Sequence, residues 1–218
     1  GGGTINLGAE FSGTAGAILF SGPVVLTADT EIANQGPGAG STVTFADTVD
    51  GGFDLAVSTA GGGIFFEGDI GASTALANLD VDSAASVELE NIGGAQLGVD
   101  GDAAIAAGGG DIIFNGTAYE AGSATFTASG QHSVTSGATA FTTRGGNIVF
   151  AGGDIVLTNG SDLTVSTDGG DGTFTNIRGD SDEDITVDLG NGTGTFEQIG
   201  QDDEIGDISM TLGNVALN

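Results

Sequence analysis

The segment Gly63-Ile64-Phe65-Phe66-Glu67-Gly68 sets the pattern of the whole chain, because similar short apolar runs between glycines return along its length. The related runs are centred on Phe20, Phe45, Phe114, Phe150, Phe174 and Phe196. From Phe20 the intervals between these phenylalanines are 25, 21, 48, 36, 24 and 22 residues. The interval of 48 is twice 24, whereas the interval of 36 breaks the rhythm. A repeat in the low twenties is typical of a solenoid coil.

Short runs with period-two alternation lie between these phrases, for example Leu55-Ala56-Val57-Ser58 and Ile185-Thr186-Val187-Asp188-Leu189. Such alternation predicts strands with one buried face and one solvent face. Turn pairs such as Asp50-Gly51 and Asn115-Gly116 separate the runs, because glycine and asparagine accept positive φ at little steric cost. Each period is therefore expected to hold two or three strands joined by tight corners.

These features predict an all-β fold, a right-handed parallel β-helix (β-solenoid) with coils of roughly 20–25 residues. The alternative is an antiparallel β-sandwich, which also has short strands but rarely repeats one glycine–phenylalanine phrase at near-constant intervals. We interpret residues 1–218 as a single β-solenoid segment of a longer repeat protein. Residues 179–218 carry a denser acidic cluster and are expected to form a divergent end coil or an interface region.

The composition excludes several classes of function. The 218 residues include 43 glycines and 30 acidic residues, but only two arginines, no lysine and no cysteine, and the formal net charge is −28. Without cysteine there are no disulfides, thiolate metal sites or cysteine nucleophile. Nucleic acid is not expected as a partner, since phosphate binding depends on cationic side chains. No membrane span is expected either, because no stretch approaches about 20 apolar residues.

Residues 61–93 carry a longer motif. A glycine–apolar–phenylalanine strand leads to the phrase Gly71 to Leu76 and Leu79, which is followed by a second strand around Val87. This segment resembles the β-strand repeats of very large bacterial surface proteins, the filamentous-haemagglutinin-like and autotransporter-type adhesins. Residues 16–60 and 108–167 match more loosely. The resemblance implies export, an extracellular or bacterial cell-surface location, and a non-catalytic role in adhesion, matrix or filament building.

The densest acidic run offers a candidate calcium site. Asp180, Asp182 and Asp184 alternate along the chain, and Ca²⁺ takes six to eight oxygen ligands. An EF-hand loop is excluded, because Ile185 and Asn191 stand where that loop needs a glycine and a bidentate acid. The simpler interpretation of the run is a solvated turn. Calcium is the one cofactor that the sequence suggests.

Catalysis is not expected. His132 is the only histidine, and neither a nucleophile-elbow phrase nor a matching partner accompanies it, so we expect a polar surface residue and no enzyme. Asn115, Asn159 and Asn191 each begin an Asn-Gly-Ser/Thr triplet that fits the glycosylation acceptor pattern. Asn-Gly is also the commonest tight-turn pair, which is the simpler interpretation.

The sequence therefore predicts a non-catalytic extracellular structural protein. We expect a rigid, acidic segment of a bacterial surface adhesin, or of a self-assembling extracellular filament or matrix fibre. The expected partners are further copies end to end or neighbouring repeats of the same protein, since the end strands of a solenoid present unpaired edges. A cell-surface or polysaccharide ligand is also expected. The alternative function is a Ca²⁺-dependent carbohydrate-binding or polysaccharide-cleaving β-helix.

Overall fold

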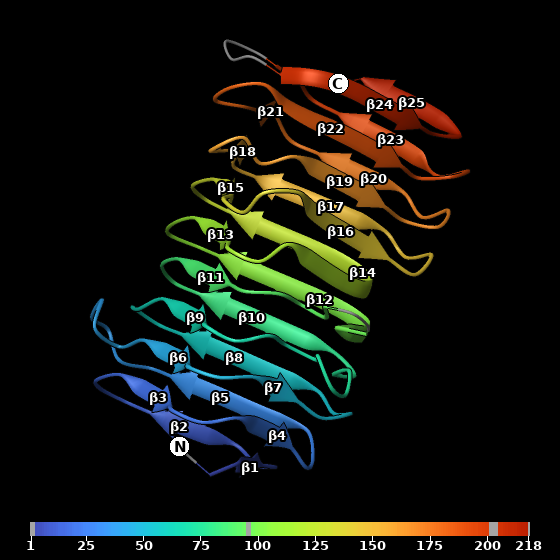
Figure 1. Cartoon of the computed structure of the whole chain (residues 1–218). Coiled ribbons are helices and arrows are strands. Elements are labelled where there is room, and N and C mark those ends of the chain that lie inside the picture. The colour runs from blue at the N-terminus through green and yellow to red at the C-terminus, as the bar shows by residue number, and fades with distance from the viewer. Residues whose placement is uncertain (1–2, 95–96, 201–204, 218) are drawn as a thin grey trace.

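The computed structural model describes residues 3–94, 97–200 and 205–217. The chain winds into a right-handed parallel β-solenoid of about nine turns, in which three short strands per turn form three faces (Figure 1). Every strand pair within the described residues is parallel, and these residues include no helix. The predicted β-helix is therefore confirmed, and the antiparallel sandwich is excluded.

Face 1 begins each turn, and single bridges through Ile70, Ile92 and Tyr119 continue it where no regular strand forms. Its strands are β1 (Ile5–Leu7), β4 (Val24–Leu26), β7 (Val49–Asp50), β16 (Thr139–Thr143), β19 (Leu163–Ser166), β22 (Glu183–Asp188) and β24 (Ile205–Thr211).

Face 2 follows face 1 in each turn. Its strands are β2 (Phe11–Gly13), β5 (Thr30–Asn34), β8 (Leu55–Thr59), β10 (Leu79–Ser83), β12 (Val99–Ala107), β14 (Ala118–Ala128), β17 (Ile148–Gly152), β20 (Gly172–Phe174), β23 (Thr193–Phe196) and β25 (Asn214–Leu217). The long strand β14 turns the corner, because its first half pairs with β16 on face 1 and its second half with β17 on face 2.

Face 3 closes each turn with very short strands. They are β3 (Ile18–Phe20), β6 (Val43–Phe45), β9 (Ile64–Phe66), β11 (Val87–Leu89), β13 (Ile112–Phe114), β15 (His132–Val134), β18 (Ile155–Leu157) and β21 (Ile177–Arg178).

The strand registers show how long each coil is. Successive partners on face 1 are separated by 19 residues from Ile5 to Val24 and by 27 from Ile92 to Tyr119. The coils thus vary somewhat more than the predicted 20–25 residues.

The core consists of like side chains stacked in columns. Phe20, Phe45 and Phe66 stack on face 3 with ring centroids 5.0 and 4.7 Å apart, and Phe174 and Phe196 stack on face 2 at 4.9 Å. Between the two stacks lies a cluster of five rings, Phe114, Tyr119, Phe126, Phe141 and Phe150. In it Phe114 meets its neighbours edge to face, whereas Tyr119 stacks on Phe141 and Phe126 stacks on Phe150. The phenylalanine column changes face within this cluster, from Phe114 in β13 on face 3 to Phe126 in β14 on face 2, and Phe150 in β17 follows Phe126 one coil later. This change explains the irregular interval of 36 residues in the sequence.

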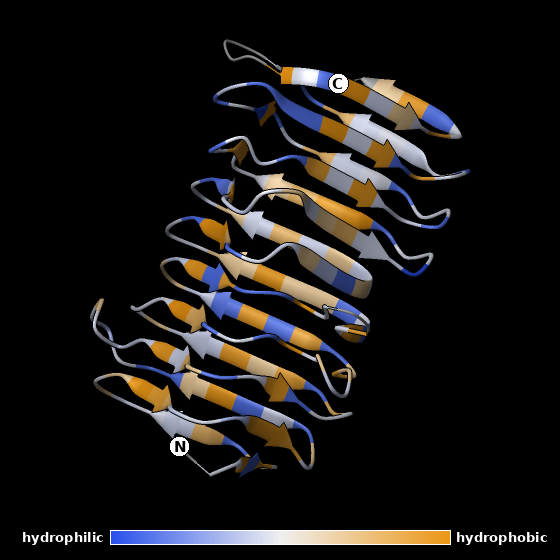
Figure 2. Cartoon of the chain, viewed as in Figure 1, coloured by the Kyte–Doolittle hydropathy of each residue, from blue (hydrophilic) through white to orange (hydrophobic). Residues whose placement is uncertain are grey.

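The strands alternate between buried apolar and outward polar residues, so the colour along single strands changes from orange to blue or white in Figure 2. The described part of residues 179–218 continues the same solenoid with β22 to β25, which stack on β19 and β20. This region is therefore built as further coils of the same kind. Its role as an interface stays a prediction.

Candidate functional site

A ladder of acidic and amide side chains runs along the corner between faces 1 and 2. Asp29 Oδ1 accepts a hydrogen bond from the backbone N–H of Asp54 at 3.2 Å, and Asp54 Oδ1 accepts one from the Asn78 amide at 2.8 Å. Asn78 Oδ1 in turn accepts from the backbone N–H of Asp102 at 2.9 Å. Farther along the same corner, Asn147 and Asp171 accept from backbone N–H groups one coil later. Each of these side chains therefore ties its coil to the next one.

The other two corners use the same device. Asp162 Oδ1 accepts from the backbone N–H of Asp184, and Asp184 Oδ1 from that of Asp207, at 2.9 and 2.7 Å. Asp111 Oδ1 accepts from the backbone N–H of Gln131 at 2.8 Å. A carboxylate that accepts a backbone N–H bond forms a charge-assisted hydrogen bond, which is stronger than a neutral one. Part of the acidity of the chain thus has a structural role that only the strand register reveals.

Of the predicted calcium residues, Asp180 and Asp182 lie in the corner before β22, and Asp184 is the second residue of that strand. Asp180, Asp182 and Asp184 are all exposed. Asp180 accepts from the backbone N–H of Asn159 at 3.1 Å, and Asp184 belongs to the corner ladder. Within the described residues, no three His, Cys, Asp or Glu side chains are grouped closely enough to hold a metal ion. The calcium site stays a prediction, and any ion there would need oxygen ligands beyond these carboxylates.

Glu183, within the same run, is a buried carboxylate that sequence reasoning missed. Its side chain points inward from β22 and is 0 % exposed. Oε1 accepts from the Ser181 hydroxyl at 2.9 Å and from the Gly160 N–H at 3.3 Å, while Oε2 accepts from the Ser181 N–H at 3.0 Å. Burial alone would raise the pKa of Glu183. The hydrogen bonds that its carboxylate accepts, the one from the Ser181 N–H foremost, outweigh this effect and hold the pKa at about 2. The carboxylate therefore closes this corner as a buried anion.

His132 is also buried, so the expectation of a surface position was wrong. It occupies the inward column of face 3 between Ile112 and Ile155 and is 0 % exposed. The ring nitrogens lie 3.0 Å from the carbonyl oxygen of Gly153 (Nδ1) and 3.2 Å from that of Phe126 (Nε2). Burial lowers the pKa of His132. A neutral imidazole carries one N–H, so the ring can donate to one of these two carbonyl oxygens, and it lies enclosed by the backbone of the solenoid interior.

The two arginines act at corners. The Arg144 guanidinium donates to the carbonyl oxygens of Leu97 and Val99 and lies 3.4 Å from the Asp100 carboxylate, almost two coils earlier. It thereby holds a loop in which Leu97 has a φ of 86°. Arg178 forms an ion pair with Asp154, with Nε 2.9 Å from Oδ2.

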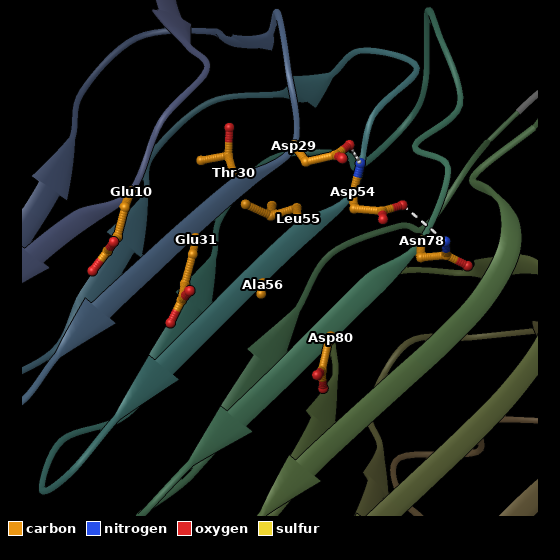
Figure 3. Close-up of a pocket in the computed structure, with 9 residues that line it drawn as sticks. All are labelled: Glu10, Asp29, Thr30, Glu31, Asp54, Leu55, Ala56, Asn78 and Asp80. Carbon is orange, nitrogen blue, oxygen red and sulfur yellow. Dashed lines mark hydrogen bonds between the residues drawn. The ribbon is translucent and has the colours of Figure 1, made fainter.

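A groove with a volume of about 480 Å³ lies on face 2 near the N-terminal end (Figure 3). Its floor forms because the small Ala56 stands between the longer side chains of Glu31 and Asp80 in the outward row. Asp54 and Asn78 border it on the corner ladder, and the dashed lines of Figure 3 mark their bonds. The groove is acidic, because five of its nine lining residues are Asp or Glu, and none of the nine is aromatic.

The three glycosylation triplets lie at turns. Asn115 follows β13 and accepts from the Thr135 hydroxyl at 3.0 Å, whereas Asn159 and Asn191 are exposed. Asn159 has a φ of 59°, a left-handed turn conformation that asparagine tolerates. The structure is thus consistent with the turn interpretation, and glycosylation stays a prediction.

Comparison of the chain with profiles of known protein families, with curated proteins and with solved structures found no match. Among the described residues, no helix is long and apolar enough to cross a membrane.

Proposed function

We propose that the chain is a non-catalytic structural segment of an exported bacterial protein, which acts as a rigid acidic rod in a surface adhesin, a filament or a matrix fibre. The observation that supports this most is the continuity of the hydrogen bonding between coils. Backbone pairing runs without a break from β2 to β24, and the corner ladders join coil to coil. Such a rod transmits force along its axis and sets a fixed distance between whatever lies at its two ends.

The two end coils supply the proposed contacts of this rod. Ile208 and Met210 continue the inward columns above Ile185 and Val187, yet they are 49 % and 37 % exposed. At the other end, Phe11 pairs with Ile32 and is 46 % exposed. Apolar side chains beside an unpaired strand edge favour a further parallel coil. We assign that coil to neighbouring repeats of the same protein or to a second copy stacked head to tail.

A pulling experiment tests the mechanical role. The 218-residue chain is stretched from its two termini, and we expect coils to be released one after another. Each coil of about 22 residues adds roughly 75 Å of extended chain. A single unfolding step at low force would contradict a load-bearing rod. Immunolabelling of intact cells that make the protein tests its location, and label confined to the cell interior would refute the exported role.

The alternative function, Ca²⁺-dependent carbohydrate binding or cleavage, has the groove of Figure 3 as its support. Carboxylates such as Glu31 and Asp80 accept hydrogen bonds from sugar hydroxyls, and the Asn78 amide both donates and accepts. Binding and product assays on neutral and acidic polysaccharides, with Ca²⁺ and with chelator, distinguish this function from the rod. Chelator-sensitive binding that is lost in Glu31→Ala would favour the carbohydrate function.

A further inference from the structure

Face 3 presents one outward side chain per coil, because each of its three-residue strands turns its first and third residues inward. The strand registers place these outward residues in a single row, which we call the face 3 stripe. In chain order the stripe consists of Leu19, Thr44, Phe65, Glu88, Ile113, Ser133, Val156 and Arg178.

The stripe differs from the rest of the surface in its charge. It holds one acid and one base, whereas the whole chain has a formal net charge of −28. Half of its positions are apolar, and Leu19 is 62 % exposed. The outward row of face 2 contains Glu31 and Asp80 in its first coils, but its later members Ala104, Thr125, Val149 and Thr173 carry no charge. A second highly acidic molecule thus meets little repulsion from the outward side chains of the stripe, and face 3 is distinguished by the order of these side chains.

The order of residues in the stripe is self-complementary about Ser133. Ile113 and Val156 lie one coil to either side of Ser133, and Glu88 and Arg178 lie two coils away. Coils rise by a nearly constant strand spacing of about 4.8 Å. A two-fold axis through Ser133 thus brings Ile113 of one copy onto Val156 of the other and Glu88 opposite Arg178.

Arg178 is suited to this position. Its ion pair with Asp154 holds the guanidinium at the edge of face 3, and its side chain remains 30 % exposed. Each two-fold contact would therefore place Glu88 beside a cation that is already oriented. A two-fold interface uses every contact twice, so one complementary pair supplies two ion pairs.

We propose that face 3 is a docking surface for a second copy of this chain, packed antiparallel about a two-fold axis at Ser133. The contact is lateral and does not depend on the end-to-end contacts proposed above. Because the stripe is only one side chain wide, the contact buries less than the roughly 800 Å² per partner of a standard interface. The dimer of the 218-residue chain is thus weak, and it gains strength where several such segments lie side by side.

Sedimentation equilibrium of the 218-residue chain over a wide concentration range, at raised salt to screen the net charge, measures the dimer. Val156→Thr keeps the shape and the β-branch but adds a hydroxyl at the contact, and we expect it to raise the dissociation constant about tenfold. Val149→Thr is the matched control, because Val149 is the outward residue of an Ile-Val-apolar strand on face 2. A strictly monomeric chain, or an equal effect of both substitutions, would overturn the proposal.

Charge exchange tests the pairing of Glu88 with Arg178. Glu88→Arg sets two cations against each other, so the dimer should weaken about tenfold. The double variant Glu88→Arg with Arg178→Glu restores opposite charges and should recover most of that loss, provided that its melting curve shows a folded chain. Glu88→Gln serves as the second variant if the exchange of Arg178 unfolds the corner, and it should weaken the dimer by a smaller factor. If no substitution at Glu88 changed the dissociation constant of the dimer, the two-fold register would be refuted.

Discussion

The ring of Phe66 lies flat on that of Phe45, one coil earlier, with the centroids 4.7 Å apart and the planes 4° from parallel. Both rings are at most 2 % exposed. Stacked rings at this separation gain attraction beyond the area that they bury. The solenoid core depends on such contacts, in which similar buried side chains stack on one another in successive coils.

Replacement of Phe45 tests this column. Phe45→Ala removes a buried ring and leaves a cavity between Phe20 and Phe66, so we expect a loss of about 3–5 kcal/mol in the free energy of unfolding. Phe45→Leu fills part of the space and should cost less. The control is Phe53→Ala, since Phe53 is 37 % exposed and should change stability by well under half as much. Equal effects at Phe45 and Phe53, measured by urea denaturation, would contradict the stacked core.

Asp50 tests the corner hydrogen bonds. Its Oδ1 accepts from the backbone N–H groups of Ser73 at 2.7 Å and Thr74 at 3.0 Å, one coil later. Asp50→Ala leaves both donors without this acceptor, and we expect a loss of about 2 kcal/mol at neutral pH. Asp82→Ala is the control for charge removal, because Asp82 points outward from β10 and is exposed. Thermal or urea denaturation measures the stability of both variants. If Asp82→Ala lost as much stability as Asp50→Ala, the loss at Asp50 would be due to the removed charge and not to the two hydrogen bonds.

The fold was largely predictable from the sequence. Alternation predicted a strand over Leu55–Ser58, which the structure shows as β8 (Leu55–Thr59), and the repeated glycine–phenylalanine phrase predicted the run that forms β9 (Ile64–Phe66). The repeat length indicated a parallel solenoid. The change of face between Phe114 and Phe150 was not predictable, because an interval shows only how far apart two inward residues are. The face on which each one lies depends on where the corners fall.

The side chains of the corners were predictable only in part. His132 lies two residues before the inward Val134, so strict alternation would have indicated a buried position. The same rule places Glu183 on the face of Ile185 and Val187. His132 was expected at the surface, and the acidic run that contains Glu183 was interpreted as a solvated turn, because polar residues usually lie at the surface. The carboxylates of the ladders could not be found this way, since their donors lie one coil away and depend on register.

His132 should make stability depend on pH near neutrality. Burial lowers its pKa in the folded state, whereas the unfolded value is about 6.5. As the pH falls through 6.5, the unfolded chain takes up the proton first, so stability decreases until the pH lies below the folded pKa. His132→Ile matches its column neighbours Ile112 and Ile155 and should abolish the change between about pH 7 and 5. An unchanged profile in this variant, by thermal melts across that range, would refute the assignment.

Glu183 should act in a more acidic range. Its folded pKa of about 2 lies below the ordinary value of 4.5, so its contribution is complete above 4.5 and is lost as the pH falls toward 2. Glu183→Gln replaces one acceptor oxygen by an amide that faces the Ser181 and Gly160 donors, and we expect it to cost about 2 kcal/mol at pH 7. The difference from the unsubstituted chain should shrink steadily between pH 4.5 and pH 2. A difference that stays constant over this range would show that the ionised form is not what stabilises the corner.

Salt should stabilise the folded chain, because its 30 acidic residues, offset by only two arginines, repel one another on a compact rod. We expect Tm to rise with NaCl as the Debye length falls from about 10 Å at 0.1 M to about 3 Å at 1 M. If Ca²⁺ binds at Asp180, Asp182 and Asp184, CaCl₂ should raise Tm further at matched ionic strength, by mass action on the folded state. Asp182→Asn should remove that additional rise, whereas Asp82→Asn, which deletes the same charge from face 2, should keep it. Equal melting curves in NaCl and CaCl₂ at matched ionic strength would refute the calcium site. A Tm that does not change with the concentration of either salt would refute the proposed repulsion between the acidic residues.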